Sequence, residues 1–260
     1  MTLDPLAPFR LDGQVALLTG ASSGLGMRFA HVLHGLGATV VLTARRADRL
    51  EALADELDAV SPGRAIVIPG DVGEPGANEG FVAAAVERAG SLDVVVANAG
   101  IANSKPAIRE TPEDFVSVLN IDLVAPFVLA RAAAMYWREQ KRGGSVVMVA
   151  SAAGLTSESL LPQAGYVAAK TGLIGLTREL AVQWARYNIR VNALCPGMFP
   201  SEMTSEVTDN PDIQAAFENS IPLKRLGAAH ELDGALAFLT GGGSSYMTGQ
   251  TIVVDGGLNS

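Results

Sequence analysis

The stretch Thr19-Gly20-Ala21-Ser22-Ser23-Gly24-Leu25-Gly26 joins a short β-branched run to a longer segment with helical spacing. Glycines allow a tight turn and a close backbone approach, and free N–H groups at the start of a helix attract the pyrophosphate of a dinucleotide. The glycines follow the spacing G-x-x-x-G-x-G, which differs from the G-x-G-x-x-G fingerprint. This stretch therefore predicts a dinucleotide site, with an ordinary glycine-rich turn as the alternative.

Residues 20–24 also fit the G-x-S-x-G turn that carries the nucleophile of α/β hydrolases. Such an enzyme needs an oxyanion loop from an earlier strand and a histidine downstream of the serine. Only one expected strand precedes Ser22, and of the three histidines only His230 lies far downstream, inside an expected helix. We therefore favour a phosphate-binding turn over a hydrolase.

Short β-branched runs alternate with longer Ala- and Leu-rich segments along the chain. The expected strands are residues 15–19, 39–43, 65–68, 94–97, 146–149, 190–194 and 251–254. The expected helices are residues 25–36, 48–60, 80–88, 113–138, 166–187 and 228–239. This alternation predicts an α/β fold, a doubly wound parallel sheet of Rossmann-like type with helices on both faces. Ligands of such folds bind beyond the carboxyl ends of the strands.

Composition limits the number of domains and the kinds of partner. A chain of 260 residues with 48% hydrophobic content can bury one core, so we expect a single domain over residues 1–260, which would include both the dinucleotide site of the glycine turn and any catalytic residues. The long irregular stretch 196–226 contains several prolines and a short helical piece, which is typical of a lid over a substrate site. The net charge of −8 argues against nucleic acid as a partner, because phosphate contacts need clustered Lys and Arg side chains.

Cysteine usage and hydropathy indicate the compartment. The single cysteine, Cys195, excludes an intrachain disulfide, and residues 1–10 lack a basic run followed by an apolar core, so we expect a cytoplasmic protein. No uninterrupted run of about eighteen apolar residues occurs, and we expect no membrane span. His31 and His34 have metal-ligand spacing on one expected helix, but no carboxylate or thiolate partner is evident nearby, and we expect no metal site.

Four further motifs accompany the glycine turn: Asn98-Ala99-Gly100, Ser151, Tyr166-x-x-x-Lys170 and Pro196-Gly197. In this order, and over nearly the whole chain, the motifs resemble those of the short-chain dehydrogenase/reductase family. The resemblance implies a single-domain Rossmann-like fold and a homotetramer. It also implies that a nicotinamide cofactor and a small-molecule substrate bind at one edge of the sheet.

The spacing of Tyr166 and Lys170 places both side chains on one face of the expected helix. An isolated tyrosine has a pKa near 10 and is a poor base at neutral pH, but an adjacent ammonium group and an oxidised nicotinamide both favour the phenolate. We therefore expect Tyr166 to be the catalytic acid/base, and Lys170 also to bind the nicotinamide ribose. Ser151, at the end of the fifth expected strand, would hydrogen-bond the substrate oxygen and orient it.

The resemblance assigns further residues to the cofactor site. Those around the adenine and along the cleft are Asp71, Val72, Asn98, Ala99 and Gly100. Those at the nicotinamide end are Pro196, Gly197, Met198 and Ser201. Ser201 replaces a threonine that bonds the nicotinamide carboxamide in many family members, and its hydroxyl can donate the same bond.

The residues Thr43-Ala44-Arg45-Arg46 end the second expected strand, where cofactor choice is decided. An NAD enzyme places a carboxylate there for the ribose 2′-OH, whereas an NADP enzyme must accommodate a 2′-phosphate. Ala44 removes the repelling carboxylate, and Arg45 can pair with a phosphate through two N–H groups. Arg45 and Arg46 also stand at a helix start, where the positive helix end opposes cations unless an anion is bound. We therefore expect NADP(H) rather than NAD(H).

Two features depart from the family pattern. The connection between Ser151 and Tyr166, residues 152–165, is slightly longer than the usual dozen or so residues, with 157–161 as its middle, so the substrate pocket should differ.

Asp122 aligns with an asparagine whose backbone carbonyl is thought to hold a water in a proton relay to the lysine. Because a carbonyl would hold the water, Asp122 could serve, and its carboxylate could stabilise the charge on Lys170. Asn120 cannot replace it, because residues two apart on a helix do not share a face.

The sequence thus predicts an NADP(H)-dependent oxidoreductase of the carbonyl reductase type, which transfers a hydride between the nicotinamide and a ketone or secondary alcohol. One alternative is a 3-oxoacyl-thioester reductase. An alternative of another class is a non-catalytic NADP-sensing protein.

Overall fold

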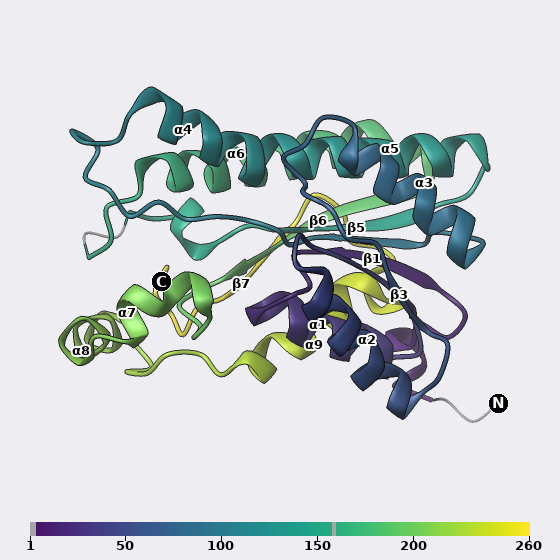
Figure 1. Cartoon of the computed structure of the whole chain (residues 1–260), viewed down its shortest axis with the longest axis horizontal. Helices are drawn as coiled ribbons and strands as arrows, with labels where there is room; N and C mark the ends of the chain where they lie inside the picture. Colours follow the sequence, from purple (N-terminus) through teal and green to yellow (C-terminus); the bar gives the residue numbers. More distant parts are fainter. Residues whose placement is uncertain (1–3, 158–159) are drawn as a thin grey trace.

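Seven parallel strands form one sheet in the computed structural model of the chain, which describes residues 4–157 and 160–260 (Figure 1). The strands are β1 (Val15–Thr19), β2 (Thr39–Thr43), β3 (Ala65–Val67), β4 (Val94–Ala97), β5 (Gly144–Val149), β6 (Ile189–Pro196) and β7 (Thr251–Val254). Their spatial order is β3-β2-β1-β4-β5-β6-β7, and every neighbouring pair is parallel. The predicted α/β fold with a doubly wound parallel sheet is confirmed.

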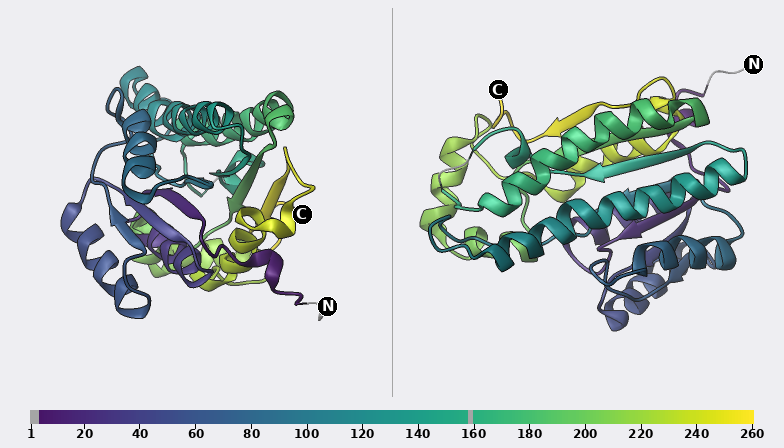
Figure 2. Two further views of the ribbon diagram at one scale, coloured as in Figure 1. Left: turned by 90° about the vertical axis from the view of Figure 1, so that its right-hand side faces the viewer. Right: turned by 90° about the horizontal axis from the view of Figure 1, so that it is seen from above.

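Helices cover both faces of the sheet (Figures 1 and 2). One layer contains α1 (Gly24–Gly35), α2 (Ala47–Val60) and α9 (Asp233–Thr240). The other layer contains α3 (Ala77–Ala89), α4 (Pro112–Leu119), α5 (Ala125–Glu139) and α6 (Ala164–Trp184). Successive side chains of a strand point to opposite faces. Leu17 and Leu18 of β1 therefore enter different cores, and neither has exposed surface. Both faces of the strands must be apolar, which explains their continuous apolar runs.

The strand order places the candidate site. The chain runs from β1 outward to β2 and β3 and then returns to β4 on the other side of β1, so a crevice opens at the carboxyl ends of β1 and β4. The hydroxyl of Thr19, which ends β1, accepts hydrogen bonds of 3.1 Å from the backbone N–H groups of Asn98 and Ala99 after β4. Segments about eighty residues apart in the chain thereby meet at one edge of the sheet.

The predicted helix over residues 113–138 changes its hydrogen-bond pattern near its middle. α4 ends at Leu119, α5 begins at Ala125, and Asn120–Val124 form a π turn between them. Proline has no N–H, and its ring clashes in an α-helix with the carbonyl four residues earlier. Pro126 therefore cannot donate to the carbonyl of Asp122, and a wider turn relieves the clash. The predicted helix over residues 113–138 is therefore present as Pro112–Glu139, with a π turn inside it.

The segment Pro112–Glu139, α4 to α5, is the one helix within residues 4–157 and 160–260 that is long and apolar enough to cross a membrane. This segment contains no uninterrupted run of eighteen apolar residues, because single polar residues interrupt it. Apolar runs of the sequence therefore gave no sign of a possible span. In the fold this helix lies against the sheet. Leu129, Ala133 and Trp137 are buried, and Trp137 Nε1 donates to the carbonyl oxygen of Leu92 at 2.7 Å. Its apolar composition therefore contributes to the core.

The predicted lid, residues 196–226, contains more helix than expected. It includes the 3₁₀ turn η5 (Glu202–Thr204), α7 (Ser205–Thr208) and α8 (Pro211–Ser220), beyond the carboxyl end of β7 (Figure 1). The side chain of Asn210 accepts from two N–H groups of the first turn of α8, and proline follows it at the first helical position. An asparagine cap followed by proline is a helix-start signal. The sequence therefore contained evidence for α8.

Candidate active site

A cavity of about 450 Å³ opens at the carboxyl ends of the strands. The residues predicted to bind the cofactor come from six different loops and helices, and the structure brings nearly all of them to its wall. They are Gly20, Ser22, Ser23, Gly24, Leu25, Gly26, Arg45, Arg46, Asp71, Val72, Asn98, Ala99, Gly100, Tyr166, Lys170, Pro196, Gly197 and Ser201. Met198 is the exception, because it lines an adjoining cavity instead.

The glycine turn is closely packed on itself. A Cβ on Gly26 would lie 2.0 Å from the carbonyl oxygen of Gly20, and Gly20 has a φ of +70°. Asn98 Nδ2 donates to the carbonyl oxygen of Thr19 at 3.0 Å and holds the turn against the loop after β4. α1 begins at Gly24 on the cavity wall, and the first N–H groups of a helix have no partner within it. The turn therefore presents backbone donors that suit a pyrophosphate.

Lys170 lies at the centre of the site and is almost fully buried. Its Nζ donates to the carbonyl oxygen of Val149 at 3.0 Å and lies 3.1 Å from Asp122 Oδ2. The same Nζ is 5.5 Å from the centre of the Tyr166 ring. Gly100 provides the space for this pair, because a Cβ there would lie 2.9 Å from Asp122 Oδ2. One ion pair thus connects α6, the π turn and the end of β5.

The charges of this pair depend on each other. Burial lowers the pKa of the Lys170 ammonium group, but Asp122 and Tyr166 together outweigh burial, and the pKa is raised above its ordinary value of 10.5. Burial raises the pKa of the Asp122 carboxyl, against the charge of Lys170 and a hydrogen bond of 2.8 Å from the Ile101 N–H. Lys170 is therefore protonated at neutral pH, beside the phenol of Tyr166.

A second cavity, of about 90 Å³, adjoins the first. Ser151 and Tyr166 line both cavities. Ser151 Oγ accepts a hydrogen bond of 3.1 Å from the N–H of Ala153, which fixes the side chain and leaves its O–H free to donate. Residues of the connection 152–165 form part of the second wall, although 158 and 159 lie outside the described residues. A carbonyl group in the second cavity would therefore meet two hydroxyl groups at the boundary with the first.

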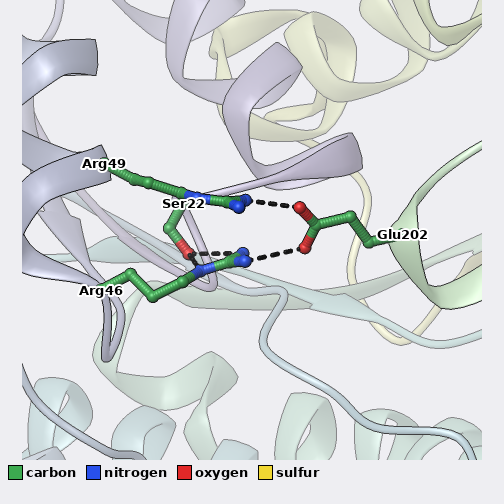
Figure 3. Close-up of polar contacts among 4 residues, drawn as sticks. All are labelled: Ser22, Arg46, Arg49 and Glu202. Atoms are coloured by element: carbon green, nitrogen blue, oxygen red, sulfur yellow. Dashed lines mark hydrogen bonds and ion pairs between the residues drawn. The ribbon is translucent and has the colours of Figure 1, made fainter.

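The two arginines after β2 have different surroundings. Arg45 is largely exposed, and its Nη1 lies 3.9 Å from Asp71 Oδ2. Arg46 extends across the cavity, where its Nη1 donates to Glu202 Oε2 at 2.9 Å (Figure 3). Its Nε and Nη2 each donate to Ser22 Oγ at 3.2 Å. Both arginines thus line the cavity, and each lies close to a carboxylate, Arg46 within hydrogen-bond distance.

Some residues of the site have no signal in the sequence. Glu202 accepts hydrogen bonds from Arg46 and Arg49, which lie more than 150 residues earlier in the chain. A contact between residues so far apart leaves no local pattern in the sequence. The hydroxyl of Thr204 accepts the N–H of Ser201 at 2.8 Å and fixes that residue. Within the described part of the chain, no group of three His, Cys, Asp or Glu side chains suits a metal ion.

Cys195 lies close to the site but has no exposed surface. Burial raises the pKa of its thiol to about 11. The thiol is therefore protonated at neutral pH, in agreement with its interpretation as a small core residue.

Comparison with known proteins agrees with this geometry. Residues 20–259 match a family model described as enoyl-(acyl carrier protein) reductase. The chain is 35% identical over 248 residues to the 3-oxoacyl-(acyl-carrier-protein) reductase of Rickettsia prowazekii, a match that covers 95% of this chain and 98% of that protein. It is 34% identical over 257 residues to the glucose 1-dehydrogenase of Gluconobacter oxydans, covering 97% of this chain and 95% of that protein.

Solved structures share the whole fold. A short-chain type dehydrogenase/reductase from Mycobacterium marinum superimposes with a TM-score of 0.93 and 35% identity, over 97% of this chain and 98% of that one. A gluconate 5-dehydrogenase from Burkholderia cenocepacia, in complex with NADP and tartrate, gives a TM-score of 0.92 and 30% identity over 98% of both chains. The protein therefore belongs to the short-chain dehydrogenase/reductase family and is an oxidoreductase of that family.

Proposed function

We propose that the protein is an NADP(H)-dependent carbonyl reductase, which transfers a hydride between the nicotinamide and a ketone or secondary alcohol. The observation that carries this proposal is that Ser151 and Tyr166 line both cavities. A dinucleotide in the large cavity and a carbonyl compound in the small one would meet at these two hydroxyl groups. Lys170 stands behind Tyr166, with its Nζ 5.5 Å from the centre of the ring.

Each of the three residues has a distinct chemical role in the proposal. The nicotinamide, when bound, supplies or accepts the hydride. In reduction, Tyr166 gives its phenolic proton to the carbonyl oxygen, and in oxidation it takes the proton of the alcohol. Ser151 donates a hydrogen bond to the same oxygen and orients it. The ammonium group of Lys170 favours the phenolate that remains after the proton has left.

Arginines at the adenosine end support NADP(H) over NAD(H). Ala44 lines the cavity at the position where a carboxylate would repel a 2′-phosphate. The guanidinium of Arg45 has one distant contact, at 3.9 Å, and can turn toward a phosphate to donate two N–H groups. The related gluconate 5-dehydrogenase was solved in complex with NADP.

The lining of the small cavity supports an uncharged substrate. Within the described part of the chain, its wall includes no Lys, Arg or His side chain, and it includes Glu206. A carboxylate or phosphate on the substrate would therefore lack a cation and face a like charge. The apolar side chains of Met198, Met203 and Phe217 favour aliphatic groups around the carbonyl.

Reduction of a 3-oxoacyl thioester is the second candidate, because the relative from Rickettsia prowazekii carries that name. Comparison of an acyl-carrier thioester with simple ketones separates the two reactions. A non-catalytic NADP-sensing protein would have no need of Ser151, Tyr166 and Lys170 in this arrangement, so their joint presence supports an enzyme.

We also propose that Asp122 replaces the asparagine of the family pattern. Pro126 has no N–H to donate to the Asp122 carbonyl, so this oxygen can accept a hydrogen bond from a water in a proton relay. The carboxylate lies 3.1 Å from Lys170 Nζ and stabilises its charge. The backbone and the side chain of this residue would thus act in different ways on the same lysine.

Replacement of Tyr166 by phenylalanine tests the catalytic assignment. Loss of a general acid lowers kcat by about 10²-fold or more. NADPH binding, measured by fluorescence, should remain close to that of the wild type, since the ring is retained. The fully exposed Tyr246 provides the control, because Tyr246→Phe should leave both quantities unchanged. Substantial ketone reduction by Tyr166→Phe would refute the assignment.

The substitution Arg45→Asp tests cofactor choice. It removes a two-point phosphate partner and adds a repelling charge, so kcat/KM for NADPH should fall by about 10- to 100-fold while that for NADH does not fall. Arg109→Asp, on an exposed loop, makes the same change of charge away from the cavity and serves as control. The NADP proposal is ruled out if wild type uses both cofactors equally well or if Arg45→Asp leaves the preference intact.

The substitutions Asp122→Asn and Asp122→Ala test the ion pair. Lys170 has a raised pKa in the folded protein, so the pair stabilises the fold below the unfolded pKa of about 10.5, and this stability is lost as pH rises through the folded pKa. Removal of one partner of a buried pair costs about 3–5 kcal/mol, measurable by urea unfolding at pH 7. The alkaline limb of the kcat profile should also move to lower pH. An unchanged rate and pH profile in both variants would exclude a role for Asp122.

We propose, finally, a cytoplasmic homotetramer. Four large apolar side chains of neighbouring helices are exposed on the single chain: Val116, Val124, Met135 and Val182. Subunit contacts in a tetramer would cover these side chains. Light scattering should give the mass of four chains, and the mass of a single chain at micromolar concentration would overturn the proposal.

A further inference from the structure

A carboxylate from the lid lines the large cavity and bonds to two arginines (Figure 3). Glu202 lies in η5, whereas Arg46 is the N-cap of α2 and Arg49 lies in its first turn. Arg46 Nη1 donates to Glu202 Oε2 at 2.9 Å, and Arg49 Nη1 donates to Glu202 Oε1. The two oxygens of one carboxylate thus bind two guanidinium groups and connect η5 to the start of α2.

Arg46 and Arg49 lie at the start of α2, where a nearby anion stabilises them. The first turn of a helix has a positive end, so cations placed there are unfavourable unless a negative group is bound. Hydrogen bonds from Arg49 and then Arg46 lower the pKa of the Glu202 carboxyl to about 2, so it is anionic at neutral pH. In this structure the required anion is part of the protein itself.

Glu202 occupies the surroundings in which the proposed function puts the 2′-phosphate. Arg46 bonds to Ser22 on the glycine turn, and Ser22, Arg45, Arg46 and Glu202 line one cavity. A carboxylate between guanidinium groups presents its oxygens much as a phosphate does. A phosphate bound by Arg45 and Arg46 would carry up to two negative charges and would repel the neighbouring carboxylate. The two anions therefore compete for Arg46.

We propose that Glu202 substitutes for the cofactor phosphate in the unliganded protein and that NADP(H) displaces it from Arg46. This inference rests on the proposed function. Glu202 thereby lowers the affinity for NADP(H) selectively, because NAD(H) has no phosphate that competes for Arg46. It is a specificity-determining residue that acts against the phosphorylated cofactor.

Displacement of Glu202 also affects the lid. η5 follows Ser201, and a Cβ on Gly24 of the glycine turn would lie 3.1 Å from Ser201 Cβ, so this part of the lid lies directly against the turn. The bonds from Glu202 to Arg46 and Arg49 hold η5 to the start of α2. Binding of a phosphate at Arg46 removes one of these bonds and loosens the lid at the side where the cofactor enters.

The substitution Glu202→Gln in the full-length protein tests the competition. Dissociation constants are measured by calorimetry at pH 7 for NADPH, NADH and the fragment adenosine 2′,5′-bisphosphate, which reports on the phosphate site without the nicotinamide. The ion pair is partly exposed, so the expected gain is moderate: tighter binding of NADPH and of the fragment by about 3- to 10-fold, and NADH within twofold. The gain should shrink at high salt.

A matched control separates this effect from a general change of charge. Asp209→Asn removes one exposed carboxylate of the same lid, seven positions away, and should leave all three constants unchanged. Equal tightening of NADPH and NADH, or weaker NADPH binding by Glu202→Gln, would overturn the inference. The second result would mean that Glu202 closes over the bound cofactor. If wild type binds neither NADPH nor NADH, the proposed function fails as well, whereas wild-type NADPH binding with unchanged constants in Glu202→Gln refutes this inference alone.

Discussion

A buried ammonium group organises the candidate active site of this protein. Lys170 Nζ donates to the carbonyl oxygen of Val149 at 3.0 Å and pairs with Asp122 at 3.1 Å, so it joins α6 to the end of β5 and to the π turn. A buried charge without partners is unfavourable by several kcal/mol, and the surrounding segments are therefore constrained to supply them. The absence of a side chain at Gly100 follows from the same requirement, because a Cβ there would crowd the pair.

The π turn is linked to this pair through a single proline. Pro126 cannot continue an α-helix without a clash at Asp122, and the turn Asn120–Val124 widens at that point. Asp122 is consequently both the partner of Lys170 and the residue whose carbonyl lacks a donor from Pro126. The π turn and the buried ion pair thus meet at the same residue, Asp122.

Much of the architecture follows from the sequence for a simple reason. Strands buried on both faces must be apolar throughout, which makes them visible in the sequence. Gly20 has a positive φ and Gly26 leaves no space for a Cβ, so few other residues fit these two positions of the turn. Local signals were also present for two details of the helices: Pro126 marks the π turn, and Asn210 before a proline marks the start of α8. The placement of Met198 in the small cavity depends on how the lid folds, which residue order alone does not specify.

Contacts between charged side chains that lie far apart in the chain could not be predicted from the sequence. The sequence predicts an anion beside Arg46, but nothing in it points to Glu202. Their bond arises because the lid returns across the carboxyl ends of the strands. The sequence predicts a bound ligand as the anion beside Arg46. In the unliganded chain, the carboxylate of Glu202 is that anion. A site for a charged cofactor can therefore carry its own internal counter-ion, which limits affinity for that cofactor.

In the proposed reaction, a hydride passes between NADPH and a carbonyl carbon at the boundary of the two cavities. The most direct measurement follows deuterium from NADPH that carries deuterium at both C4 positions of the nicotinamide into an uncharged ketone, with mass spectrometry of the alcohol. Deuterium bound to the carbinol carbon in stoichiometric amount with the NADPH consumed is the expected result. Tight NADPH binding with no label in any alcohol, across ketones and 3-oxoacyl thioesters alike, would disprove the claim and leave a protein that binds the cofactor without reacting it.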